Sequence, residues 1–127
     1  KEGLKLFMER GCGQCHAGPL LGGRQFQKFG LFKDYWTLTG SLEPDEGRFL
    51  LTHQEGDRYV FKVPGLRNVA MTPPYFHDGS VEDLRSAIRI MGQAQLGQNL
   101  TDPEVEAIEA FLNTLTGTQP KHFSPLN

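Results

Sequence analysis

The sequence predicts an all-α fold in which a few helices are joined by long irregular segments. Apolar residues recur at helical spacing in three stretches, at residues 3–10, 84–91 and 105–115. Residues 17–44 are rich in glycine and aromatic side chains, but they sustain neither the two-residue period of a strand nor the 3.6-residue period of a helix. No two segments alternate convincingly in the way that paired strands do. We therefore expect helices to supply the regular structure.

The first helix is predicted from Gly3 to Arg10. Leu4, Phe7 and Met8 share one face of it, and Gly11 ends it. This ending places the first cysteine of the chain at or just after the last helical turn.

A second main helix is predicted to begin near Ser80 and to end at Gly92. The sequence from Ser80 to Asp83 resembles a capping box with Asp in place of Glu. Its apolar face consists of Leu84, Ala87, Ile88 and Met91. A third helix begins after Thr101, the expected N-cap, with Glu104 as the capping-box partner. Its buried stripe and closing glycine are Val105, Ile108, Phe111, Leu112, Leu115 and Gly117.

The rest of the chain is expected to be less regular. We predict a long folded loop from Ala17 to Pro44, a length that is usually functional. A short helix is expected from Asp45 to about Thr52. Residues 60–79 contain three prolines and should be extended or turning.

Length and composition limit the classes of protein. The 127 residues suit one domain, expected at residues 1–117, with a tail at 118–127. A net charge of −2 with 22% charged residues excludes a disordered polyelectrolyte and a strongly basic nucleic-acid binder. No apolar run is long enough to span a membrane. Because the chain begins with Lys1, we expect a removed leader or a piece of a longer protein.

Cys12, Cys15 and His16 form the Cys-x-x-Cys-His pattern that is typical of c-type haem attachment. Two thiols about one helical turn apart can form thioethers with the vinyl groups on one edge of a porphyrin. The adjacent imidazole can then reach the iron from the same side, and Gly13 leaves room for the macrocycle near the backbone. A haem would also fill the thin core that three short helices leave. We therefore predict one covalent haem c.

Other chemistries compete for the same pattern. A thioredoxin-like dithiol would need a preceding strand, and a zinc site would need a fourth ligand from His53, His77 or His122, none of which has ligand-like spacing. The cysteines could also be ordinary core residues. A disulfide across so short a loop would add almost no stability.

The second axial ligand of the iron must come from elsewhere in the chain. The candidates are Met8, Met71, Met91, His53, His77 and His122. Met8 lies four residues before Cys12, on the helix that precedes the motif, so it cannot readily reach the opposite face of the haem, and His122 is in the tail. By position, Met91 is favoured because it closes a helical face, although core filling is its simpler interpretation. Met71, in a proline-rich loop, remains open.

Several segments together resemble the C-terminal haem domain of bacterial di-haem cytochrome c peroxidases and their MauG-like relatives. They are FKVPGLRNV at 61–69, PYFHDG at 74–79, Met91-Gly92, Gln95-Leu96, and Phe111 to Gly117. The resemblance covers residues 3–117 and implies a cytochrome c-like domain whose loops wrap one haem.

The resemblance also implies roles for single residues. It implies thioether attachment at Cys12 and Cys15, proximal ligation by His16 and distal ligation by Met91. MauG-like enzymes have a tyrosine at this last position, so Met91 favours the peroxidase type. It further implies a calcium ion near Thr72 and Pro74, for which a structural turn is an equal alternative.

Arginine and lysine side chains could contact the haem propionates. Arg67 is the stronger candidate and Lys62 the weaker, although surface charges usually have no such specific role.

The family carries two Cys-x-x-Cys-His motifs, and this chain has one. The resemblance therefore implies the electron-transfer half of a peroxide-reducing enzyme, with a second, peroxidatic haem domain and a small cytochrome c or cupredoxin donor as partners. The alternative is peroxide reduction at this haem itself, after Met91 leaves the iron and with His77 or Asp78 as acid–base groups. Thioether assembly implies a periplasmic location. No nucleic-acid partner is expected.

Overall fold

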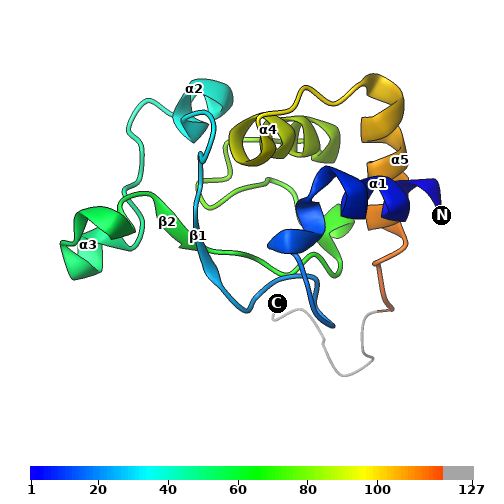
Figure 1. Cartoon of the computed structure of the whole chain (residues 1–127), viewed down its shortest axis with the longest axis horizontal. Helices are drawn as coiled ribbons and strands as arrows, with labels where there is room; N and C mark the ends of the chain where they lie inside the picture. The colour runs from blue at the N-terminus through cyan, green and yellow to red at the C-terminus, as the bar shows by residue number, and fades with distance from the viewer. Residues whose placement is uncertain (119–127) are drawn as a thin grey trace, which may run out of the picture.

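The computed structural model describes residues 1–118, so most of the predicted tail, including His122, lies outside the described residues. The elements in chain order are α1 (Glu2–Arg10), η1 (Cys12–Gln14), β1 (Phe26–Lys28), α2 (Tyr35–Thr39), α3 (Phe49–Thr52), η2 (Glu55–Asp57), β2 (Val60–Lys62), η3 (Val69–Met71), α4 (Leu84–Leu96) and α5 (Asp102–Asn113). Helices α1, α4 and α5 lie at one end, whereas α3 and the strands lie at the other (Figure 1).

Helices α1 and α5 cross at Gly3, which is buried (Figure 1). A Cβ atom at this position would lie 1.8 Å from the Ala107 carbonyl oxygen and 2.8 Å from the Phe111 Cβ. Only glycine therefore allows the two backbones to approach so closely. The predicted end of α1 is confirmed, since Gly11 adopts φ 106° and its N–H donates to the Met8 carbonyl.

Helix α4 differs from the prediction at both ends. Its N-cap is Asp83, whose carboxylate accepts a hydrogen bond from the Ser86 N–H at 2.9 Å. Ser80 is not the cap, because Val81 forms an antiparallel bridge with Tyr75 and is held in extended backbone. The helix also continues past Gly92 to Leu96, and Gly97 ends it with φ 63°.

The capping prediction for α5 is confirmed. The Thr101 side chain and the Glu104 carboxylate form the reciprocal capping box, and a proline occupies the first turn. The helix ends at Asn113, four residues before the predicted stop at Gly117.

The all-α expectation is wrong for one part of the chain, because β1 and β2 form a two-stranded antiparallel sheet. Phe26 pairs with Lys62, and Lys28 pairs with Val60. The sheet starts inside the segment that was predicted to be one long loop, and α2 follows it. Three-residue strands are too short to show an alternating pattern in the sequence.

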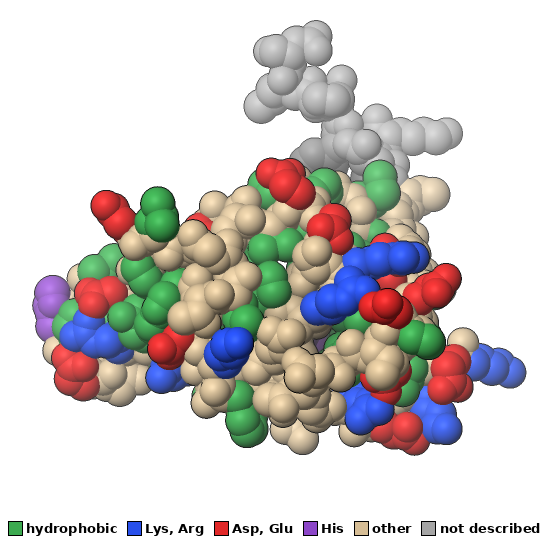
Figure 2. Space-filling model, turned by 90° about the horizontal axis from the view of Figure 1, so that it is seen from above, with side chains coloured by type: hydrophobic (Ala, Val, Ile, Leu, Met, Phe, Trp, Pro, Cys, Tyr) green, Lys and Arg blue, Asp and Glu red, His purple; other side chains and the backbone are tan. Residues whose placement is uncertain are grey.

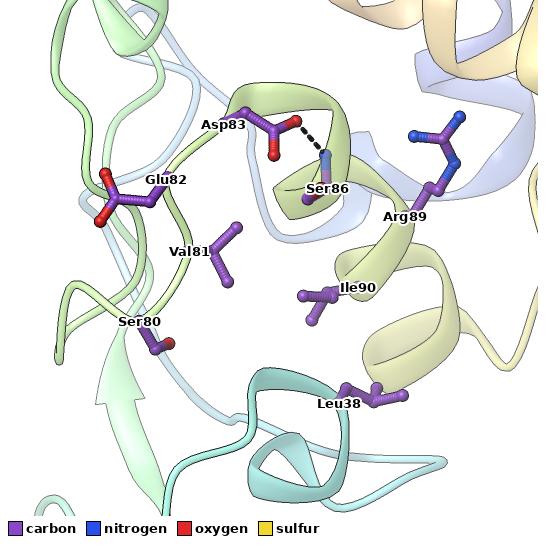
Figure 3. Close-up of a pocket in the computed structure, with 8 residues that line it drawn as sticks. All are labelled: Leu38, Ser80, Val81, Glu82, Asp83, Ser86, Arg89 and Ile90. Atoms are coloured by element: carbon purple, nitrogen blue, oxygen red, sulfur yellow. Dashed lines mark hydrogen bonds between the residues drawn. The ribbon is translucent and has the colours of Figure 1, made fainter.

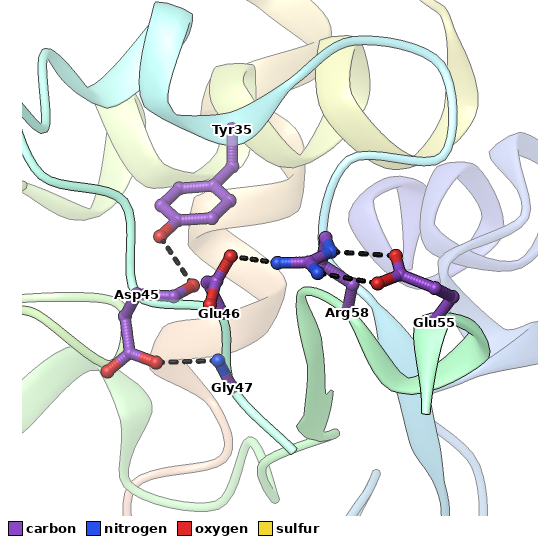
Figure 4. Close-up of polar contacts among 6 residues, drawn as sticks. All are labelled: Tyr35, Asp45, Glu46, Gly47, Glu55 and Arg58. Atoms are coloured by element: carbon purple, nitrogen blue, oxygen red, sulfur yellow. Dashed lines mark hydrogen bonds and ion pairs between the residues drawn. The ribbon is translucent and has the colours of Figure 1, made fainter. Parts of the chain in front are cut away.

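The predicted helix from Asp45 is also shorter, since α3 begins only at Phe49. The preceding residues are bonded to β2 instead: Gly47 forms a bridge with Val60, and the Arg48 N–H donates to the Val60 carbonyl. Arg58 pairs with Glu46 and Glu55 and closes this segment (Figure 4). The Tyr35 hydroxyl donates a hydrogen bond to the Asp45 carbonyl oxygen at 3.1 Å and so joins α2 to the same segment (Figure 4).

Three apolar clusters form the core. Phe7, Ile88, Val105, Ile108 and Leu112 bring α1, α4 and α5 together. Phe29, Tyr35 and Ala94 form an aromatic cluster between the loop after β1 and helix α4, and Tyr75, Val81 and Ala87 form a third. Figure 2 shows charged side chains of both signs at both ends of one face, with hydrophobic side chains among them toward the α3 end. Leu51 of α3 is 86% exposed.

Candidate haem site

The Cys-x-x-Cys-His segment directly follows α1. Cys12 begins η1, Cys15 caps it, and the His16 N–H donates to the Cys12 carbonyl at 3.0 Å. Both cysteines are half-buried and neither is in a disulfide. The tight turn therefore presents both thiols and the imidazole from one short segment, as attachment to one edge of a porphyrin requires.

The imidazole of His16 is fixed by two backbone carbonyls. Its Nδ1 lies 3.2 Å from the Leu21 oxygen and 3.2 Å from the Pro64 oxygen. Carbonyl oxygens only accept, so Nδ1 carries the proton and Nε2 keeps its lone pair. Burial lowers the pKa of His16, which favours the neutral ring. A neutral imidazole with an anchored Nδ1 is the form that binds a metal.

The approach of the Pro64 carbonyl depends on Gly22. This residue has φ 133°, and a Cβ atom on it would lie 2.0 Å from the Pro64 oxygen. These contacts cannot be predicted from the sequence, because backbone carbonyls leave no side-chain signal. The adjacent glycines Gly22 and Gly23 are the nearest available clue.

The surroundings of the Cys12 thiol bear on the thioredoxin-like alternative. Burial raises the pKa of the Cys12 thiol. A reactive dithiol typically has a lowered thiol pKa. The direction of this shift therefore disfavours the thioredoxin-like alternative.

Among the methionine candidates, only Met91 is half-buried. Met8 is 60% exposed and Met71 is 68% exposed. Met91 lies on α4 and packs against the aromatic cluster of Phe29, Tyr35 and Ala94. Met91 thus belongs to the cluster around Tyr35, whereas His16 is held by Leu21 and Pro64, so the ligand role of Met91 stays a prediction.

The other candidates have structural partners. The His77 ring stacks on Phe61 at a centroid distance of 4.1 Å and meets Tyr35 edge-on at 5.1 Å. Asp78 accepts hydrogen bonds from the Ser41 hydroxyl at 2.6 Å and the Ser80 N–H at 3.1 Å. These contacts agree with the alternative in which the segment shapes a turn.

His53 is the left-handed cap of α3, at φ 54°, and its ring lies against Phe49. It is therefore placed at the α3 end of the molecule, away from α1 (Figure 1). This position does not favour it as a ligand.

Arg67 lies beside the loop that follows His16, because its Nε donates to the Pro19 carbonyl at 2.7 Å. This location is compatible with the predicted contact to a propionate. Lys62 is the last residue of β2, where its backbone pairs with Phe26, and its side chain is exposed.

Thr72 and Pro74 are both exposed. The peptide bond that joins Pro74 to Pro73 is cis. Among residues 1–118, no group of three or more His, Cys, Asp or Glu side chains is arranged to hold a metal ion. Calcium takes six to eight oxygen ligands, so two backbone positions would need further ligands from elsewhere.

Two surface depressions lie away from this segment. One, of about 390 Å³, lies at the start of α4 between Leu38, Asp83 and Arg89 (Figure 3). The other, of about 340 Å³, lies between α3 and the sheet. Neither is lined by Cys12, Cys15, His16 or Met91.

The sequence of the chain is similar to those of known bacterial proteins. It is 49% identical over 128 residues to the cytochrome c551 peroxidase of Pseudomonas aeruginosa, covering 99% of this chain and 36% of the relative. It is also 49% identical over 125 residues to the cytochrome c551 peroxidase of Nitrosomonas europaea, covering 98% and 36%. This chain is homologous to part of a bacterial cytochrome c peroxidase. No protein-family model matches it.

The structure agrees with this relationship. A MauG-like protein associated with microbial copper homeostasis has the same fold, with a TM-score of 0.73, 28% sequence identity, and coverage of 92% of this chain and 46% of that protein. The resemblance to cytochrome c peroxidases and MauG-like proteins is thus confirmed. The chain spans about a third of the length of the cytochrome c551 peroxidases that it matches.

Among residues 1–118, no helix has the length and apolar character that crossing a membrane requires.

Proposed function

We propose that this chain is an electron-transfer domain that holds one haem c, with Cys12 and Cys15 as thioether donors and His16 and Met91 as axial ligands. The observation that carries the proposal is the imidazole of His16, whose Nδ1 is anchored by two carbonyls directly after two unpaired thiols. The homology to cytochrome c551 peroxidases supports the same assignment. The proposed domain is residues 1–117.

The residues around the site have separate tasks. A bound haem would supply one iron that takes up and releases single electrons. The carbonyls of Leu21 and Pro64 hold the His16 ring in one orientation and one tautomer. As a ligand, the Met91 thioether would raise the reduction potential relative to a second imidazole. The apolar cluster of Phe29, Tyr35 and Ala94 beside Met91 would keep water from a bound haem and so disfavour the more highly charged ferric form.

Peroxide reduction at the same haem is the alternative, and it requires both an open iron position and an acid–base group above it. With His16 and Met91 as ligands, a bound haem would offer no open iron position. The His77 ring is stacked on Phe61, and Asp78 is bonded to two serines. We therefore propose electron transfer rather than catalysis for the isolated chain.

The remaining proposals, on partners, calcium and location, rest on the similarity to the cytochrome c551 peroxidases, which are longer than this chain. We propose that the domain passes electrons to a second haem domain that carries the peroxidatic haem, and that it receives them from a small cytochrome c or cupredoxin. Calcium would bind only where that second domain completes the ligands around Thr72 and Pro74. Thioether attachment is carried out outside the cytosol, so a periplasmic location is proposed.

The experiment for haem attachment is the intact mass of protein matured with haem. It should exceed the polypeptide mass by one haem, and the colour should resist extraction by acidified acetone. A colourless protein, or a haem lost to acetone, contradicts the proposal.

The experiment for the axial ligand compares Met91→Ala with Met71→Ala. The ferric protein should show the weak red charge-transfer band that accompanies methionine ligation. This band should disappear in Met91→Ala and persist in Met71→Ala. Steady-state peroxide turnover by the wild-type chain should not exceed that of free haem, and a higher rate would favour the enzymatic alternative.

A further inference from the structure

Gln95 ties the loop after β1 to helix α4. Its Oε1 accepts a hydrogen bond from the Gly30 N–H at 2.6 Å, and its Nε2 donates to the Lys28 carbonyl at 2.9 Å. The Phe32 N–H donates to the Ala94 carbonyl at 2.8 Å, which fixes the same loop to the neighbouring residue of α4. We call this set of three hydrogen bonds the Gln95 clamp.

The loop is shaped to reach the Gln95 side chain. Gly30 is buried and has φ 106°, and a Cβ atom on it would lie 2.9 Å from the Lys33 carbonyl oxygen. Phe32 lies over the end of the helix, where a Cβ atom on Gly97 would be 2.8 Å from the Phe32 ring. The loop therefore follows α4 closely, and its turn depends on glycine.

The clamp encloses Phe29, which lies between its two backbone partners. Phe29 is 7% exposed. Its ring stacks on that of Tyr35 at a centroid distance of 4.8 Å and lies 4.9 Å from the centroid of the Phe76 ring. Met91 packs against the cluster that Phe29 forms with Tyr35 and Ala94. Met91 and Gln95 are four residues apart on α4, so they lie on the same face of the helix.

We propose that Gln95 is a positioning residue for Met91. By holding the Phe29 loop against α4, it maintains the apolar wall against which the Met91 side chain packs, and so would limit the movement of the thioether when it serves as a ligand. This inference rests on the proposed function, in which Met91 is the second axial ligand. Without the amide, the Gly30 N–H and the Lys28 carbonyl lose their partners, and the loop can move away from the helix.

The test uses the haem-loaded protein and the variant Gln95→Leu, which has a similar volume and neither hydrogen bond. The matched control is Gln93→Leu, on the same helix, where the described residues show no side-chain hydrogen bond for Gln93. Ferric protein is titrated with imidazole, which displaces a loosely held thioether. We expect the apparent imidazole affinity to rise about tenfold in Gln95→Leu and to change less than about twofold in the control.

Two further readouts report on the same ligand. In Gln95→Leu the charge-transfer band of methionine ligation should weaken and the reduction potential should fall. Gln95→Glu keeps an oxygen for the Gly30 N–H but sets a charged oxygen against the Lys28 carbonyl, so the apparent imidazole affinity should rise in this variant too. This variant carries the test if Gln95→Leu does not fold.

A purely structural role gives a different pattern. If Gln95→Leu lowers the midpoint of thermal unfolding but leaves imidazole affinity, the charge-transfer band and the potential at wild-type values, the proposal is overturned. A wild-type band that survives Met91→Ala overturns the ligand assignment itself, and the positioning role with it. The two failures are therefore distinguishable.

Discussion

At the scale of single residues, His16 is oriented by atoms that no side-chain pattern reveals. The motif with Cys12 and Cys15 is contiguous, so the sequence identified it directly. The carbonyls that hold its Nδ1 come from Leu21 and from Pro64, 48 residues away. A local motif can therefore predict which residues meet a haem, whereas the backbone contacts that orient them depend on the fold.

Gly22 offers a test of this arrangement. We expect Gly22→Ala to destabilise the haem-loaded protein by about 2 kcal/mol or more, since its φ of 133° is unfavourable for alanine and its Cβ would press on the Pro64 carbonyl. The free energy of unfolding from urea titration measures this effect. The variant should also bind imidazole more readily, because the His16 ring is less well held.

Gly23→Ala is the matched control for Gly22→Ala. Gly23 has φ 78°, and a Cβ atom on it would meet nothing within 4 Å. Gly23→Ala therefore has the cost of placing alanine at a positive φ, but its Cβ collides with no other atom. Equal losses in the two variants would show that the approach to Pro64 does not matter.

At the scale of elements, the helices that were predicted well are those with a long apolar face and a local cap. The capping box of α5 joins residues three apart, and Gly11 ends α1 within one turn. The errors arose where distant segments decide the outcome. Gly92 lies inside α4, where a Cβ atom would come within 3.1 Å of the Leu100 side chain, and it is Gly97 that ends the helix. The β1–β2 pair joins residues more than thirty positions apart.

The crossing of α1 and α5 depends on Gly3. Alanine is the better helix former by about 1 kcal/mol, but its Cβ would overlap the Ala107 carbonyl. We expect Gly3→Ala to lower the free energy of unfolding by about 2 kcal/mol. Gly56→Ala, with no atom within 4 Å of the added Cβ, should be nearly neutral. A stabilised Gly3→Ala variant would contradict the close packing of the two helices.

The N-cap of α4 predicts a pH dependence. The Ser86 N–H lowers the pKa of Asp83, so its ionised form stabilises the folded state. This contribution is fully present above the unfolded value of about 3.9, and it is lost as pH falls through the lower folded pKa. We expect Asp83→Ala to lower the free energy of unfolding, relative to the wild type, by about 1 kcal/mol at pH 7 and by less at pH 2.

Urea unfolding at the two pH values measures the difference for Asp83→Ala. Glu82→Gln is the control, because the neighbouring Glu82 carboxylate makes no hydrogen bond to the helix among the described residues. A loss for Asp83→Ala that is equal at both pH values would show that charge has no part in the cap.

At the scale of the whole molecule, the buried residues form small separate groups. The cluster between α1, α4 and α5 and the aromatic cluster around Tyr35 share no buried member. Leu20, Leu31 and Phe32, which lie in loops, are at least half exposed. A haem attached at Cys12 and Cys15 is a flat, largely apolar group that would bury further surface between such clusters. Each Å² of apolar surface removed from water stabilises the folded state by about 25 cal/mol.

We therefore expect the double variant Cys12→Ser, Cys15→Ser to be much less stable than the haem-loaded protein. A loss of about 3 kcal/mol would lower the midpoint of thermal unfolding by ~10 °C for a chain of this size. Circular dichroism follows the midpoint, and binding of an apolar dye follows the exposure of the separated clusters. Wild-type chain produced without haem is the control, because it keeps both thiols and should match the double variant. Equal stability of all three proteins would show that the chain completes its core without the cofactor.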